Sequence, residues 1–421
     1  MKKIIIKNFG PIKEIDFCLD KQFNVIIGEQ ATGKSTLAKC IYFFKDVISE
    51  MTHLFMGQTE KLANMTADKI LQLYYVNAKK LFYLSFGRYC HSEDTEISYQ
   101  YADNRLAAIS VVNGDIQFKY DQTTEQEIKH ILMWYLEKTL SEKAADTTIF
   151  DLRALSALLE NLFGNNIRRM FIPACRSRVT GVLDQFQVQT LDIYFNALLE
   201  NIRAFKFFLE TSSEADVDVA YLHKDSVPEQ LHERIADLKS LKQKILKGDY
   251  ETDKEKTWIK LLNGTRVPVE YGSSGQQESL WILNFLTMIM YSASSRFLII
   301  EEPEAHLYPS AQLELVKLIA LVANTTGSEI LITTHSPYIL SAFNLLTYAG
   351  KVEKGNKEGL INPYQRIAPQ KLGAFKLKSG ICKDIYNAQE GLISAEEIDT
   401  VSEDINALFD KLIDKECDEM R

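Results

Sequence analysis

One short loop near the start of the chain constrains its fold more than any other feature. Residues 28–35 read Gly-Glu-Gln-Ala-Thr-Gly-Lys-Ser and directly follow the apolar run 23–27. A second apolar segment, residues 37–44, comes straight after the loop. The pattern predicts a strand, a tight loop and a helix in immediate succession. We therefore expect an α/β fold in which the loop lies at one edge of a central sheet.

The residue types in this loop are those of a phosphate site. Gly28 and Gly33 let the backbone approach phosphate oxygens where a Cβ would collide. Backbone N–H groups and the helix N-terminus then converge on a triphosphate, Lys34 reaches its β and γ phosphates, and the Ser35 hydroxyl can bind Mg²⁺. The sequence predicts ATP and Mg²⁺ as ligands, with these loop residues in contact with the nucleotide: Gly28, Glu29, Gln30, Ala31, Thr32, Gly33, Lys34, Ser35 and Thr36.

Composition excludes several classes of protein. The chain has 421 residues, which is long for a single core, so two lobes or a head with a large insertion are expected. A net charge of −9 argues against a surface devoted to nucleic acid, although DNA binding through a local basic groove stays possible. The longest apolar stretch, 280–291, is well short of the roughly 20 residues that span a bilayer, which predicts a buried helix and no membrane partner. Six scattered cysteines are typical of reduced thiols in a cytoplasmic protein.

A pair of carboxylates follows a second apolar strand. Residues 296–303 read Arg-Phe-Leu-Ile-Ile-Glu-Glu-Pro, which places Glu301 and Glu302 at the carboxyl edge of the sheet, beside the phosphate loop. In that position Glu301 would hold the hydration shell of Mg²⁺, and Glu302 would orient and deprotonate the attacking water. Taken alone, the acidic pair can equally begin an ordinary loop.

Two further segments can contact phosphate. Residues 329–336 form a third apolar strand that ends at His335, whose imidazole can hydrogen-bond the γ-phosphate or the attacking water. Residues 271–280 form a small polar loop before a long apolar helix, and Ser274, Gly275 and Gln277 there can bind phosphate at the helix N-terminus. In isolation, the histidine reads as a structural residue and the loop as an N-cap.

The order of these elements resembles a known family. The phosphate loop, the Ser-Gly-Gln loop, the Ile-Ile-Glu-Glu-Pro strand and the Thr-Thr-His strand end are similar to an ABC-type ATPase head of the branch that contains SMC, RecF and OLD-family proteins. Residues 5–12 resemble its first hairpin, and residues 300–309 resemble its Walker B and D-loop run. The resemblance covers residues 1–44 and about 271–345. It implies a P-loop NTPase head with a mixed central sheet, an antiparallel β lobe and a helical insertion or lid.

The resemblance also implies an assembly. In such heads the Ser-Gly loop of one copy closes over the ATP held by another, so a head-to-tail dimer or a higher even oligomer is expected, with Ser274 and Gly275 acting in trans.

The chain departs from the family at three positions. Glu301 replaces the usual Asp, Gln276 replaces the second glycine, and Arg176 is the polar residue nearest to the place of the Q-loop glutamine. Hydrolysis can therefore be slow. We expect Arg176 to contact nucleotide or relay its presence, with an ordinary salt bridge as the alternative.

The remaining segments define the expected domains. Residues 1–176 would form ATPase lobe I, with antiparallel strands at 81–86, 96–101 and 107–120 and a turn at Asn113-Gly114. Residues 177–270 would form a helical subdomain or short lid, because 183–262 looks helical with an apolar stripe. Residues 271–350 would complete the ATPase core, and 351–421 would pack on the head, its acidic amphipathic helix 395–412 lying on the head or docking a partner. The stripe consists of Leu231, Ile235, Leu238, Leu241 and Ile245.

The expected biological role follows from resemblance. OLD-family proteins carry a metal-dependent TOPRIM nuclease, and we find no strand followed by Glu-Gly with a later Asp-x-Asp; Glu390-Gly391 reads as a helix-to-loop break. Stand-alone heads resemble the ATPase subunits of prokaryotic anti-phage systems such as Septu and PARIS. The chain is thus interpreted as an ATP-driven switch for a separately encoded nuclease or toxin. A RecF-like DNA-binding repair ATPase is the alternative, and a transporter ATPase ranks third.

Overall fold

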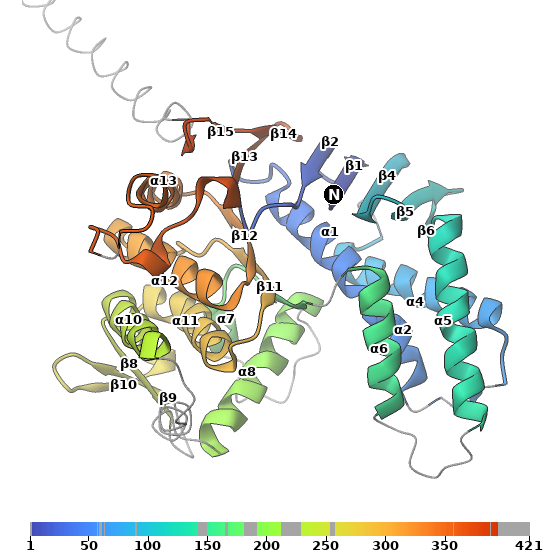
Figure 1. Cartoon of the computed structure of the whole chain (residues 1–421), viewed down its shortest axis with the longest axis horizontal. Helices are drawn as coiled ribbons and strands as arrows, with labels where there is room; N and C mark the ends of the chain where they lie inside the picture. Colours follow the sequence, from blue (N-terminus) through green and yellow to red (C-terminus); the bar gives the residue numbers. More distant parts are fainter. Residues whose placement is uncertain are drawn as a thin grey trace, which may run out of the picture.

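The computed structural model describes most of the chain. The described residues are 2–56, 58, 61–62, 64–88, 91–141, 150–164, 167–180, 192–211, 229–252, 257–356, 358–387 and 389–394. Within them an eleven-stranded mixed sheet runs through the molecule, with helices packed on it (Figure 1). No helix in these ranges is long and apolar enough to cross a membrane.

The main sheet has a parallel part and an antiparallel part. Its order is β6-β5-β4-β1-β2-β14-β13-β3-β12-β11-β7. The parallel strands are β13 (Leu372–Lys378), β3 (Phe23–Gly28), β12 (Glu329–Thr334), β11 (Arg296–Glu301) and β7 (Arg168–Ile172). The antiparallel strands are β1 (Lys3–Phe9), β2 (Ile12–Cys18), β4 (His91–Ala102), β5 (Arg105–Val112) and β6 (Asp115–Tyr120). The expected α/β fold, with a mixed central sheet and an antiparallel β lobe, is confirmed.

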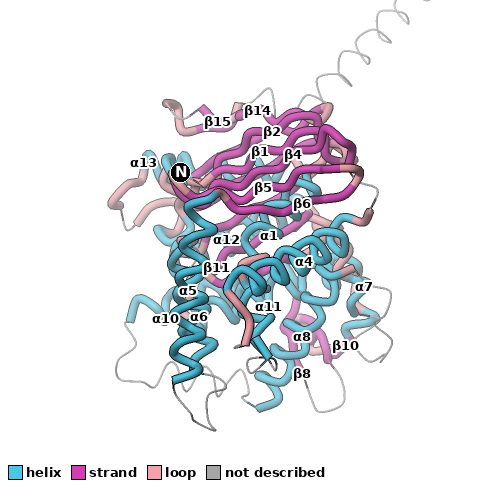
Figure 2. The backbone as a smooth tube through the Cα atoms, turned by 90° about the vertical axis from the view of Figure 1, so that its right-hand side faces the viewer, coloured by secondary structure: helices cyan, strands magenta, loops and turns pink. Residues whose placement is uncertain are grey.

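Two hydrophobic cores lie on opposite faces of the sheet. On β3, Val25 belongs to one core and Ile26 to the other, because successive strand residues point to opposite faces. The first core holds α8 (Ile193–Thr211), α10 (Glu229–Leu246), α11 (Ser274–Ser292), α12 (Pro309–Thr326) and α13 (Pro337–Val352). The second holds α1 (Lys34–Asp46), α2 (Ser49–Phe55), α4 (Ala67–Phe86), α5 (Gln122–Ser141) and α6 (Phe150–Leu162). Figure 2 shows the curved strands of the antiparallel lobe above these helices.

The antiparallel lobe follows the prediction except in one segment. The hairpin turn is at Asn113-Gly114, where φ is 54° and 73°, the left-handed conformation that tight hairpins require. Residues 81–86, however, are the last turns of helix α4, so the strand expected there is wrong. Tyr74, Ala78 and Phe82 are buried four residues apart along that helix. Six apolar residues read alone cannot separate this period from a strand period.

The helical prediction for 183–262 is correct only in part. Helices α8 and α10 lie in it, but β8 (Gly248–Thr252), β9 (Thr257–Leu261) and β10 (Arg266–Pro268) follow them and form a separate antiparallel sheet. The stripe residues Ile235, Leu238, Leu241 and Ile245 are buried in the core that α11 and α12 share, whereas Leu231 lies outside the described side chains. The stripe is therefore part of the hydrophobic core and does not belong to a separate lid.

The segment after residue 350 contributes to the main sheet. Strand β13 pairs in parallel with β3 from Leu372 opposite Phe23 to Leu377 opposite Gly28, and β14 (Ile381–Asp384) joins β13 to β2. The expectation of an extension merely packed on the head is wrong for these strands. Strands β15 (Tyr386–Asn387) and β16 (Leu392–Ile393) then pair antiparallel, and Glu390-Gly391 lies in a turn directly before β16 rather than at the end of a helix, as was expected. The predicted tail helix, 395–412, lies outside the described residues.

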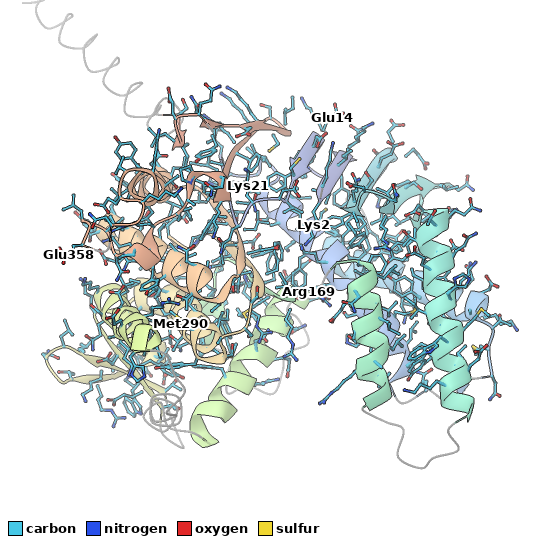
Figure 3. The ribbon with its side chains drawn as sticks, in the orientation of Figure 1. Lys2, Glu14, Lys21, Arg169, Met290 and Glu358 are labelled. Carbon is cyan, nitrogen blue, oxygen red and sulfur yellow. The ribbon has the colours of Figure 1, made fainter. Side chains whose placement is uncertain are left out.

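A half-buried ion pair connects strand β7 to the helix that follows the loop. Arg169 on β7 is labelled near the centre of the molecule in Figure 3. Its Nε donates to the carboxylate of Asp46, at the end of α1, at 2.7 Å. The pair fixes the far end of the helix that begins at the phosphate loop.

Candidate functional site

The phosphate loop connects β3 to α1, as predicted from the sequence. Ala31 and Gly33 adopt positive φ values of 59° and 105°, and Gly33 is the N-cap of α1. A Cβ on Gly28 would lie 2.4 Å from the carbonyl oxygen of Leu377, so the first glycine is required by the close approach of β13. A cavity of about 210 Å³ opens beside the loop, lined by Pro11, residues 30–36, Glu302 and His335.

Lys34 and His335 form a connected chain with Glu302 in this cavity. Lys34 Nζ donates to the carbonyls of Gly28 and Glu29 at 2.8 and 2.7 Å, and lies 3.4 Å from Nδ1 of His335. The other ring nitrogen, Nε2, lies 3.3 Å from a carboxylate oxygen of Glu302. Because a lysine ammonium can only donate, Nδ1 is assigned as the acceptor and Nε2–H as the donor to Glu302. Burial lowers the pKa of Lys34, and the nearby charges of Glu302, Glu304 and Glu301 oppose that shift.

Glu301 ends strand β11 in a buried position suited to Mg²⁺. Its side chain is 4% exposed, and one carboxylate oxygen accepts from the backbone N–H of Ala174 at 3.3 Å. Burial raises the pKa of Glu301, and a hydrogen bond from Ser35 opposes the shift. Within the described residues its Oε1 lacks a geometrically good partner. A hydroxyl and a buried carboxylate with spare acceptor capacity are ligands that Mg²⁺ accepts, so the residues fit the expected ion.

The backbone turns sharply at Glu302. Its φ is 43°, an uncommon value for a residue other than glycine, and its N–H donates to the Thr333 carbonyl at 2.8 Å. This turn presents the Glu302 carboxylate to His335. Glu304 supports the same arrangement, since its Oε1 accepts from the Thr334 hydroxyl and from the His335 N–H, both at 2.7 Å. Glu304 was not among the predicted site residues, although its position directly after the Glu-Glu-Pro run is a signal visible in the sequence.

The Ser-Gly-Gln loop begins α11, but it does not reach the cavity beside the phosphate loop. Ser273 is the N-cap and forms a capping box with Gln276, while Ser274 is exposed. The Gln277 amide donates to the Glu270 and Gly272 carbonyls at 2.9 and 3.1 Å, so it holds the loop together. A Cβ on Gly275 would lie 2.6 Å from the His306 carbonyl oxygen. Neither Ser274, Gly275 nor Gln277 lines the cavity.

The expected contact of Arg176 with nucleotide is wrong in this structure. The side chain is fully buried, at 0% exposure. Its guanidinium donates to backbone carbonyls of Pro173, Glu278, Glu301 and Glu302, and Nε lies 3.5 Å from the Glu278 carboxylate. The salt-bridge alternative therefore describes its contacts better. Burial of this kind cannot be read from the sequence, because most arginines are exposed.

Comparison with known proteins gives one family match for this chain. Residues 1–340 match the family model described as an AAA ATPase domain. No curated protein gives a significant match. Among solved structures, the chain is similar to an SMC head bound to the C-winged helix domain of ScpA, at 11% identity and a TM-score of 0.41, covering 91% of this chain and 96% of that one.

Two other SMC heads are similar at the same level. One is the SMC head domain from Thermotoga maritima, at 9% identity and a TM-score of 0.35, with 91% of this chain and 97% of that chain covered. The other, derived from Pyrococcus furiosus, has an extended coiled coil and is bound to the C-terminal domain of ScpA. It gives 12% identity and a TM-score of 0.37, covering 96% of this chain and 100% of that one. The family match over residues 1–340 is the finding on which the functional argument depends.

Proposed function

Since the chain belongs to the family of AAA ATPase domains, we propose that it binds ATP with Mg²⁺ at the phosphate loop and hydrolyses the terminal phosphate. The observation that carries the proposal is the chain of contacts from Lys34 through His335 to Glu302, beside the loop cavity. One cation, one imidazole and one carboxylate converge there on the place where a γ-phosphate would lie.

Each residue has a chemical role in this proposal. Lys34 leaves the carbonyls of Gly28 and Glu29 and donates to the β and γ phosphates. Ser35 and Glu301 would hold Mg²⁺, and the bound ion would supply positive charge to neutralise the phosphates. Glu302 accepts a proton from the attacking water, and His335 orients that water or the γ-phosphate through the nitrogen that now contacts Glu302.

We also propose that two copies pair head to tail around ATP. The support is geometric: Ser274 is exposed at the N-terminus of a 19-residue helix, outside the cavity of its own chain. A helix N-terminus of this length favours an anion, and the γ-phosphate held by a second copy would supply one. ATP would then stabilise the interface and its hydrolysis would loosen it.

The proposed biological role is control of a separately encoded effector, a nuclease or a toxin, in defence against phage. Its support is the resemblance of the motif order to the ATPase subunits of Septu and PARIS systems. We expect the protein to co-purify with that effector from its native host. Recovery as a homo-oligomer without any second protein would contradict this role while leaving the ATPase proposal intact.

Hydrolysis tests the enzymatic proposal directly. We expect release of phosphate from Mg²⁺–ATP by the parent chain, loss of nucleotide binding in Lys34→Ala, and retained binding without turnover in Glu302→Gln. Glu14→Gln is a matched control, because Glu14 is an exposed carboxylate on β2. Turnover in Glu302→Gln equal to that of the control would refute the proposed base. Strong stimulation by duplex DNA, with salt-dependent binding, would favour a DNA-repair ATPase instead.

A further inference from the structure

We propose that the buried pair of Arg176 and Glu278 is a positioning device: it sets the backbone of Glu302 and ties that geometry to the Ser273–Gln277 loop at the start of α11. The inference rests on the proposed function, in which Glu302 activates water and the loop closes over a partner's ATP. Arg176 and Glu278 touch no substrate and act only through the residues they hold.

Arg176 holds the end of strand β11 through two neighbouring carbonyls. Its Nη1 donates to the Glu301 carbonyl at 2.6 Å, and its Nη2 donates to the Glu302 carbonyl at 2.9 Å. The planar guanidinium fits this pair of acceptors as a fork, which a lysine ammonium cannot reproduce. Glu302 has its positive φ of 43° at this place. Such a backbone conformation costs free energy and persists only where its surroundings fix it.

Glu278 joins the same guanidinium to the start of α11. Arg176 Nε donates to the Glu278 carbonyl at 2.8 Å, and the backbone N–H of Arg176 donates to the Glu278 carboxylate at 2.9 Å. The other carboxylate oxygen accepts from the N–H and the hydroxyl of Ser177 at 3.0 and 2.6 Å. Glu278 lies four residues after Ser274 on α11, which is about one helical turn beyond the loop.

The pair has few alternative arrangements. Arg176 is 0% exposed and Glu278 is 2% exposed, so neither side chain can exchange its partners for water. Breaking one member of such a buried pair leaves the other charge uncompensated, which resists independent movement of the two segments. A tilt of α11 when its loop binds phosphate must therefore move the Glu301–Glu302 backbone with it. One copy would in this way adjust its own water-activating residue when it engages the ATP of its partner.

Arg176→Lys tests the device, with Arg178→Lys as the matched control, because Arg178 is an exposed arginine two residues further on. A misplacement of Glu302 by a fraction of an ångström should lower kcat about tenfold or more. KM and the affinity for a fluorescent ATP analogue should stay within about twofold, since the phosphate loop is untouched. An unchanged kcat in a folded Arg176→Lys would overturn the inference.

A double-mutant cycle with Ser274→Ala tests whether the pair couples the loop to Glu302 or only holds the Glu302 backbone in place. If the pair transmits the state of the loop, the losses in kcat from Arg176→Lys and Ser274→Ala should be less than additive, since either change already interrupts the same path. Additive losses would refute the transmission. If Arg176→Lys does not fold, Glu278→Gln in the same cycle decides the question, because it keeps the side-chain shape and removes the charge. Failure of the parent chain to hydrolyse ATP would instead count against the proposed function itself.

Discussion

Replacing Gly28 by alanine tests how strand β13 shapes the nucleotide site. The added Cβ would lie 2.4 Å from the Leu377 carbonyl oxygen and 3.0 Å from the Thr32 hydroxyl. The first neighbour is backbone and cannot rotate away. An ordinary contact is longer by about 1 Å, so either β13 or the phosphate loop must move by that amount. Overpacking of this kind costs about 1–3 kcal/mol.

The two ways of relieving the contact have different signatures. If β13 moves away from β3, the midpoint of thermal unfolding falls by a few degrees and ATP affinity is kept. If the loop moves instead, its N–H groups lose their alignment with phosphate, and the same 1–3 kcal/mol corresponds to an affinity loss of about five- to 150-fold. Thermal unfolding of the free protein, together with titration of a fluorescent ATP analogue, measures both. We expect the sum of the two losses, expressed as free energy, to fall in this range.

Gly373→Ala is the control, because it lies on the same strand pair and meets only movable side chains. Its Cβ would contact the Phe375 ring at 3.0 Å and Lys21 Cγ at 3.2 Å. We expect its stability and ATP affinity to stay close to those of the parent chain. A Gly28→Ala protein that matches this control in both measurements would refute the role assigned to β13.

Two predictions concern pH. Burial lowers the pKa of Lys45, which is 3% exposed, to about 8. Between that value and the unfolded value of 10.5 the unfolded chain binds more protons, so the free energy of unfolding should rise with pH, by up to about 3 kcal/mol. Lys45→Met should remove this rise in chemical denaturation series, and an unaltered slope would contradict it. Burial also raises the pKa of Glu301, so protons compete with Mg²⁺ at a higher pH than for an ordinary carboxyl. Half-saturating Mg²⁺ for hydrolysis should therefore rise as pH falls through that raised pKa, and a value independent of pH would count against Glu301 as the ligand.

The central site could be predicted because its strands are buried on both faces. The runs that became β3, β11 and β12 are mostly apolar, and they lead directly into the phosphate loop, the Glu301–Glu302 pair and His335, respectively. Parallel pairing then brings the phosphate loop, Glu302 and His335 to one edge without further information. The local sequence is therefore enough to predict nearly all of this arrangement.

The remaining features depend on contacts between distant residues. Strand β13 reads Leu-Gly-Ala-Phe-Lys-Leu-Lys, with lysines and a glycine, and nothing in it predicts a central position beside the phosphate loop. Arg176 meets Glu278 across about a hundred residues of sequence, so its burial depends on tertiary packing. The contacts of Glu304 depend on tertiary packing in the same way, since the groups that donate to its carboxylate, the Thr334 hydroxyl and the His335 N–H, lie at the end of β12.

The most direct test of the proposed ATP-driven pairing is the light-scattering mass of Glu302→Gln with and without ATP and Mg²⁺. Removing the base should trap the ATP-bound state. The account predicts a shift from monomer toward dimer on addition of nucleotide, and loss of that shift when Ser274 is also changed to arginine, which would block the approach of the second copy. A fixed assembly whose mass ATP leaves unchanged would contradict the account and would make the nucleotide a structural component.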